Sequence, residues 1–128
     1  MERDYSVKIA SVSKELTKTQ RIAIKDVSDC IRIDEAVSST PDGNVIINVD
    51  YFAELSVHNE RAKDDKDYSN YIIVDKDGTK YVTGSRSFWN SFLDINEEME
   101  GEDFSIKVYS KPSKNYNGKY FITCSIIA

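Results

Sequence analysis

The residues of this chain with the clearest chemical potential are lysines and tyrosines that gather toward its C-terminus. No Asp or Glu follows Asp103, although the whole chain carries a net charge of -5. Aromatic rings can stack on the bases of a single-stranded nucleic acid while neighbouring ammonium groups meet its phosphates. The pattern therefore indicates a nucleic-acid-binding face. Its candidate residues are Lys80, Tyr81, Lys107, Tyr109, Lys111, Lys114, Tyr116 and Lys119.

The segment 104–110 shows this pattern most clearly. Side chains alternate between the two faces of a strand, so Ile106 and Val108 should point to the core. Lys107 and Tyr109 should then share the outer face. Each residue taken alone also has a structural explanation, because Tyr is a good strand former and Lys often protects exposed sheet edges. The joint pattern across the acid-free end of the chain favours nucleic-acid contact.

Catalytic and metal-binding motifs are not found in the sequence. It contains no G-x-S-x-G, Walker or H-E-x-x-H motif. Cys30, Cys124 and His58 are too few for a structural zinc site, and the two cysteines are expected to be reduced, buried residues. Adjacent carboxylates lie in polar segments, where burial cannot raise a pKa for general acid catalysis. The sequence therefore predicts a protein that is not an enzyme and that uses no metal or other cofactor.

Composition predicts one soluble domain over residues 1–128. The hydrophobic fraction is 40% and the charged fraction 30%, which is typical of globular proteins. No apolar run reaches the roughly 18 residues of a membrane-spanning helix, and the N-terminus lacks the features of a secretory signal, so a cytoplasmic location is expected. The net charge of -5 argues against generic coating of duplex DNA, which depends on many Lys and Arg contacts to phosphate.

Alternating and periodic apolar residues define the elements that must position the candidate side chains. One helix is predicted over 86–99, because Phe88, Phe92 and Ile95 recur at helical spacing behind a capping serine. Trp89 is expected to pack beside this stripe, with base stacking as the alternative if its ring is exposed. The predicted strands cover 5–12, 29–37, 45–57, 71–75, 79–84, 104–110 and 119–127.

Three segments allow more than one interpretation. Residues 17–27 fit either a strand or a short helix capped by Thr17, and a helical turn followed by a strand is favoured. The stretch from Phe52 to Val57 reads as extended or partly helical. Residues 59–69 are almost wholly polar and predict a solvated loop or a hairpin tip, and their aspartates do not follow the order of an EF-hand loop.

Many short strands and one main helix predict a mostly β protein, a small Greek-key β-barrel of the OB-fold type. Closure of a barrel removes the open edges of short strands, and the OB-fold carries a helix between its third and fourth strands. The helix at 86–99 would take that place, followed by 104–110 and 119–127 as the last two strands. The loop 111–118 between them lies where such barrels commonly hold oligonucleotides.

The C-terminal half resembles small phage single-stranded DNA-binding proteins. The resemblance lies in the order strand, Asp77-Gly78 turn, strand, helix at 87–94, strand, Lys/Gly-rich loop and apolar final strand. It implies an OB-fold that coats single strands exposed during phage DNA replication or recombination in the host cytoplasm, without sequence preference. Many bacterial members recruit replication proteins through an acidic tail, whereas this sequence ends in Cys-Ser-Ile-Ile-Ala, so recruitment through a tail is not expected.

Two functions remain open on the sequence. The first is a sequence-independent single-stranded DNA-binding protein, with replication proteins as further partners and no membrane association. The alternative is a small phage or mobile-element accessory protein that binds a host protein through acidic surfaces, as the runs at 60–67 and 94–103 suggest. The sequence leaves open whether the protein forms a homo-oligomer and whether it prefers DNA or RNA.

Overall fold

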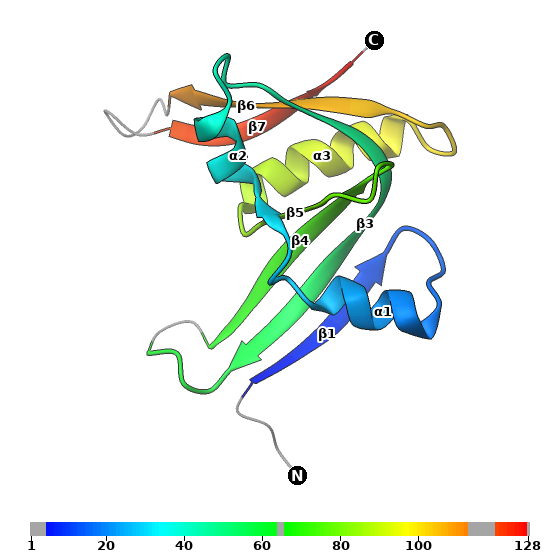
Figure 1. Ribbon diagram of the computed structural model, residues 1–128, viewed down its shortest axis with the longest axis vertical. Helices are drawn as coiled ribbons and strands as arrows, with labels where there is room; N and C mark the ends of the chain where they lie inside the picture. The colour runs from blue at the N-terminus through cyan, green and yellow to red at the C-terminus, as the bar shows by residue number, and fades with distance from the viewer. Residues whose placement is uncertain (1–4, 64–65, 113–119, 128) are drawn as a thin grey trace.

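The computed structural model describes residues 5–63, 66–112 and 120–127 and shows a mostly β protein whose curled sheet forms a half-barrel (Figure 1). This architecture confirms the predicted small OB-like barrel class. In chain order the elements are β1 (Tyr5–Val12), α1 (Lys18–Lys25), β2 (Ile31–Arg32), α2 (Ile33–Ser39), β3 (Val45–Asn59), β4 (Asp67–Asp75), β5 (Lys80–Thr83), α3 (Arg86–Glu98), β6 (Ser105–Pro112) and β7 (Tyr120–Ile126).

The long strand β3 is the centre of the sheet. It pairs antiparallel with β4 along one edge, and along the other edge it pairs with β6 through residues 45–48 and with β1 through residues 53–59. A bulge between Val49 and Tyr51 shifts the register, so Val49 faces one core and Tyr51 the other. Phe52 to Val57 is therefore extended, which settles the choice left open by the sequence.

The strand order of the sheet is β2-β5-β4-β3-β6-β7. The five strands β3 to β7, with α3 between the third and fourth of them, follow the arrangement expected of the OB-like barrel. The second neighbour of β5 is the short parallel strand β2, and within the described chain β7 pairs with β6 alone. The half-barrel is consequently open between β5 and β7.

The first core lies inside the half-barrel, where α3 packs against the sheet. Phe88 and Phe92 of α3 are fully buried against Ile47, Ile73 and other sheet residues. Trp89 is 4% exposed, and its ring stacks on Tyr71 with the centroids 4.8 Å apart. The predicted helix and its apolar stripe are confirmed, and Trp89 is a core residue that cannot stack on a base.

A second core lies on the opposite face of β3, β4 and β5. Ile24 of α1, Leu55 of β3 and Ile72 of β4 are fully buried in it, and apolar residues of β1 pack against it partly buried. Residues 71–75 of β4 are therefore buried on both faces of the sheet. The outer side of β3–β4–β5 is covered by the chain's own N-terminal segment.

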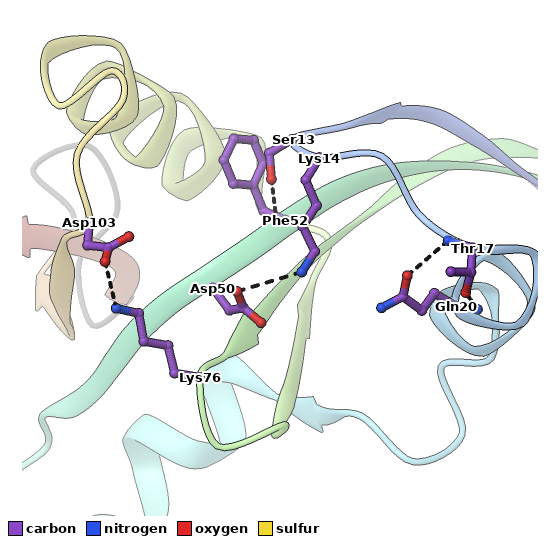
Figure 2. A network of polar contacts seen from close by, with 8 residues as sticks. All are labelled: Ser13, Lys14, Thr17, Gln20, Asp50, Phe52, Lys76 and Asp103. Carbon is purple, nitrogen blue, oxygen red and sulfur yellow. Dashed lines mark hydrogen bonds and ion pairs between the residues drawn. The ribbon is translucent and has the colours of Figure 1, made fainter.

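Polar contacts fasten this N-terminal segment to the sheet, as Figure 2 shows. The Phe52 amide donates to Ser13 Oγ at 2.9 Å, and Lys14 pairs with Asp50 at 3.8 Å beside the bulge of β3. Thr17 and Gln20 form a reciprocal capping box at the start of α1. The favoured prediction of a helix capped by Thr17 is thus confirmed, and the helix extends over Lys18–Lys25.

The predicted strand at 29–37 is wrong. Only Ile31 and Arg32 form a strand, and α2 begins at Ile33. Ile33 and Val37 are both buried, and their spacing of four residues places them on one face of a helix. The apolar alternation at residues 31–33 spans only the two-residue strand and its junction with α2. This alternation is too short to distinguish a strand from the start of a helix, and it led to the wrong prediction.

The polar segment 59–69 lies at the tip of the β3–β4 hairpin. The strands extend further into it than predicted, because β3 continues to Asn59 and β4 begins at Asp67. The Asn59 amide donates to the Lys66 carbonyl oxygen at 2.7 Å and closes the turn. The hairpin-tip interpretation is therefore confirmed for the described residues.

Candidate nucleic-acid interface

The outer side of the β6–β7 hairpin carries the residues that the sequence predicts for nucleic-acid contact. Direct cross-strand pairs place Lys107 opposite Ser125, Tyr109 opposite Thr123 and Lys111 opposite Phe121. Ile106, Val108 and Cys124 alternate with them and are buried in the first core. We call the exposed side the hairpin outer face, made of Lys107, Tyr109, Lys111, Phe121, Thr123 and Ser125.

Tyr109 lies at the middle of the hairpin outer face and is held there by its neighbours. Its hydroxyl group is 2.9 Å from Ser125 Oγ. The ammonium groups of Lys107 and Lys111 lie 5.5 Å and 5.7 Å from the ring centroid. These distances are near the limit of about 6 Å for cation–π attraction, which at exposed sites contributes only about 0.5–1 kcal/mol. Either ammonium group can therefore leave the ring for a phosphate at small cost.

The charge of the hairpin outer face is wholly positive. Neither β6 nor β7 contains an acidic residue. Within the described part of the chain, neither Lys107 nor Lys111 has a carboxylate within ion-pair distance. Apolar surface borders these charges, because Ile46 of β3 lies opposite Lys107 and is 49% exposed. The two charges, the half-buried ring of Tyr109 and the apolar surface thus lie together on one sheet face.

Lys80 lies elsewhere and already has partners. Its ammonium group donates to the carbonyl oxygens of Ala23 at 2.9 Å and Asp26 at 3.2 Å, and it pairs with Asp29 at 2.8 Å. Its side chain is only 13% exposed. Lys80 therefore supplies a charged donor at the C-terminal end of α1, where the Ala23 carbonyl oxygen also accepts from the Asp26 amide at 3.2 Å. A phosphate contact by this residue would require breaking that arrangement.

Tyr81 is likewise separate from the hairpin outer face. It lies on β5, which β4 and β3 separate from β6, and its ring packs partly against the first core. Burial raises the pKa of Tyr81, and the nearby carboxylates of Asp75 and Asp77 raise it further. Two carboxylates beside the phenol make this position unfavourable for phosphate.

The structure thus brings together three of the eight predicted site residues: Lys107, Tyr109 and Lys111. Lys114, Tyr116 and Lys119 lie outside the described residues. The prediction missed Phe121, Thr123, Ser125 and Ile46. Their signal was present in the sequence, because residues 120–126 alternate in the same way as 104–110 and place Phe121, Thr123 and Ser125 on one side.

The other groups considered for chemistry have structural partners or are shielded: Cys124 is buried as predicted, whereas Cys30 is only half-buried. His58 lies at the β3–β4 tip, with Nδ1 2.6 Å from Asp67 Oδ1 and Nε2 3.3 Å from Glu60 Oε1. The hydrogen bond with Asp67 raises the pKa of His58. Burial raises the pKa of both the Cys30 and Cys124 thiols to about 11, which disfavours the nucleophilic thiolate. Among described residues no group of three potential ligands could hold a metal ion.

None of the described helices combines the length and apolar character needed to cross a membrane. Comparison of the chain with protein-family models, curated proteins and solved structures gives no match. The resemblance of the C-terminal half to phage single-stranded DNA-binding proteins therefore stays an expectation. The interpretation of the hairpin outer face rests on its geometry and charge.

Proposed function

We propose that this protein binds single-stranded DNA without catalysis, through the hairpin outer face. The observation that carries the proposal is the row Lys107–Tyr109–Lys111 on an uncovered sheet surface without acidic residues. In such a row a base stacks on the ring while the two ammonium groups contact the flanking phosphates. Coating of single strands during phage-type replication or recombination is the biological role that this activity would serve.

Contacts of this kind would bind many sequences similarly. Every base has a π-face that can stack on Tyr109, and phosphate contacts carry no sequence information. The polar side chains of the hairpin outer face, Thr123 and Ser125, carry hydroxyl groups that can both donate and accept hydrogen bonds. They can therefore contact different bases without strong selection.

The position of the proposed site follows from what covers the rest of the sheet. OB-type barrels often bind oligonucleotides on the face of their second and third strands. The corresponding strands, β4 and β5, are covered on their outer side by α1 and its flanking residues. The β6–β7 hairpin lies on the other side of β3, where its outer face is uncovered and basic.

A salt titration with matched lysine variants tests the proposal. We would measure fluorescence anisotropy of a labelled oligo-dT with the wild type, Lys107→Gln/Lys111→Gln, and the control Lys8→Gln/Lys63→Gln. Lys8 and Lys63 are exposed residues of β1 and the β3–β4 tip. Each lost phosphate contact should lower the slope of log affinity against log salt by about 0.7. The proposal predicts this loss for the hairpin pair only, and equal slopes for all three proteins would contradict it.

A further inference from the structure

The open side of the half-barrel contains a groove of about 630 Å³ between β5 and β7. Thr83 and Ser85 line it from the end of β5 and the start of α3, and Tyr120 and Ile122 line it from β7. Arg32 of β2 completes the wall toward α2. The groove exists because β5 pairs with the two-residue strand β2, and within the described chain β7 has β6 as its sole partner.

The groove is continuous with the hairpin outer face at Phe121. This residue lies directly opposite Lys111 on the hairpin outer face, and it also borders the groove. The next residue, Tyr120, is 70% exposed, the largest exposure of any aromatic residue described. Among the described residues, Tyr120 belongs to neither core. The rings of Tyr109, Phe121 and Tyr120 therefore lead from the hairpin outer face over the edge of β7 to the groove.

The charges of the groove favour a base over a phosphate. Asp34 and Glu35 of α2 contribute carboxylates to its wall, and these would repel a phosphate group. The neutral amide group of Asn70 can instead hydrogen-bond the edge of a base. The oxygens of Thr83 and Ser85 already accept from the Ser85 and Phe88 amides, at 3.1 Å and 3.2 Å, so these two hydroxyl groups would contact a base as donors. In the described structure Arg32 has no carboxylate within ion-pair distance, so its guanidinium is available to stack on a base or to meet a phosphate at the rim.

We infer that the groove is a second base-binding subsite, in which Tyr120 stacks on a base of the same strand that the hairpin outer face binds. The inference rests on the proposed function and extends it. The strand would cross the edge of β7 at Phe121, with its phosphates outward near Lys111 and its base turned toward the groove. A short oligonucleotide would occupy the hairpin outer face alone, whereas a longer one would reach both subsites.

The test combines a length series with removal of bases. Affinities of the wild type and Tyr120→Ala would be measured for oligo-dT of about 4 and about 16 nucleotides, the two ends of the usual site-size range for such barrels. A third probe is an abasic sugar-phosphate chain of the longer length. Tyr68→Ala is the matched control, because Tyr68 is also exposed, at 41%, but lies on β4 near the far tip. Unchanged thermal midpoints would confirm that both variants fold.

The inference predicts that Tyr120→Ala weakens binding of the long oligo-dT by roughly 5- to 100-fold. The same variant should bind the short oligo-dT and the abasic chain as the wild type does, because neither places a base in the groove. The second subsite would be overturned if Tyr120→Ala bound the long oligo-dT as tightly as the wild type does. It would also be overturned if the variant lost affinity equally for both lengths. The proposed function would survive either result, provided that Lys107→Gln/Lys111→Gln weakens binding. Failure of the wild type to bind any probe would overturn both.

Discussion

Two regions of the curled sheet have similar residue types and opposite environments. On β5, Lys80 is followed by Tyr81, and on β6, Lys107 precedes Tyr109 by two residues. Lys80 is nearly buried under α1 and bonded to three oxygen atoms, whereas Lys107 is exposed and lies beside a tyrosine ring. Whether a lysine can contact a phosphate therefore depends on whether another layer covers its strand. The residue type alone does not determine it.

The N-terminal segment, which a simple barrel lacks, covers one half of the sheet and leaves the other half open. The strands β4 and β5 have apolar side chains on both faces, and α1 buries those that point outward. The strands β6 and β7 have apolar side chains on the inner face and polar, basic or aromatic ones on the outer face. One half of the sheet is therefore buried on both faces, and the other leaves a basic and aromatic face exposed, which is the face that we propose for DNA binding.

The largest expected effect concerns the covered half. Ile24→Ala should lower the free energy of unfolding by about 2–5 kcal/mol, because Ile24 is 1% exposed and its truncation leaves a cavity under α1. Ile22→Ala, two residues away on the same helix but 73% exposed, should change it by no more than about 0.5 kcal/mol. Chemical denaturation of both variants checks this. Equal stabilities would mean that α1 is not packed as described.

The next prediction concerns the different roles of Lys80 and Lys107. Lys80→Met should lower the free energy of unfolding by about 1–3 kcal/mol, because it leaves the carbonyl groups of Ala23 and Asp26 without their charged donor. Its oligo-dT affinity should be unchanged. Lys107→Met should show the reverse, with weaker binding and a change in stability within about 0.5 kcal/mol. Chemical denaturation measures the stability of both variants, and anisotropy titration measures their oligo-dT affinity. Weaker binding by folded Lys80→Met would contradict the assignment of Lys80 to a structural role.

The central ring of the hairpin outer face can be tested by two substitutions. Tyr109→Ala should weaken oligo-dT binding by about 1–3 kcal/mol, because the stacking surface is lost. Tyr109→Phe keeps that surface and loses only the hydrogen bond with Ser125, so it should bind nearly as well as the wild type. Circular dichroism controls for folding. If Tyr109→Phe were as weak as Tyr109→Ala, the hydroxyl group and not the ring would carry the contact.

The smallest effect is a pH dependence at the β3–β4 tip, far from either region. The hydrogen bond with Asp67 raises the pKa of His58 above its ordinary value of 6.5. A raised pKa in the folded state adds stability that is complete below the unfolded-state pKa and is lost as pH rises through the folded-state pKa. The free energy of unfolding should therefore decrease from about pH 6 to about pH 8 by more in the wild type than in His58→Gln. Identical pH dependence would exclude a role for this contact.

Much of the fold could be predicted because its signals are local. The stripe of Phe88, Phe92 and Ile95 fits a helix buried on one side, and the alternation on β6 fits a strand exposed on the other. The continuous apolar run from Tyr71 to Val74 is consistent with burial on both faces of β4, but only the strand was predicted from the sequence and not the second layer that covers it. The helix α2 was missed because a two-residue strand leads directly into it and produces a brief alternation.

The candidate site was predictable only in part, because exposure depends on contacts between distant segments. The oxygens that bind Lys80 belong to residues 57 and 54 positions earlier in the chain. Nothing in the sequence around Lys80 shows that α1 packs over it. Strand alternation alone was enough to predict that Lys107 and Tyr109 share one face. In contrast, Tyr120 and Arg32 both line the groove because β2 pairs with β5, and this pairing cannot be read from the sequence.

The proposed function places the nucleic acid on the uncovered half of the sheet. Chemical-shift mapping of isotope-labelled protein during titration with oligo-dT tests it most directly, because the buried Trp89 makes intrinsic fluorescence a poor reporter. We expect saturable shifts of the Lys107, Tyr109, Lys111 and Phe121 amides that weaken as salt increases, with α1 and Lys80 unaffected. Shifts concentrated on α1 and β5, with none on β6 and β7, would contradict it.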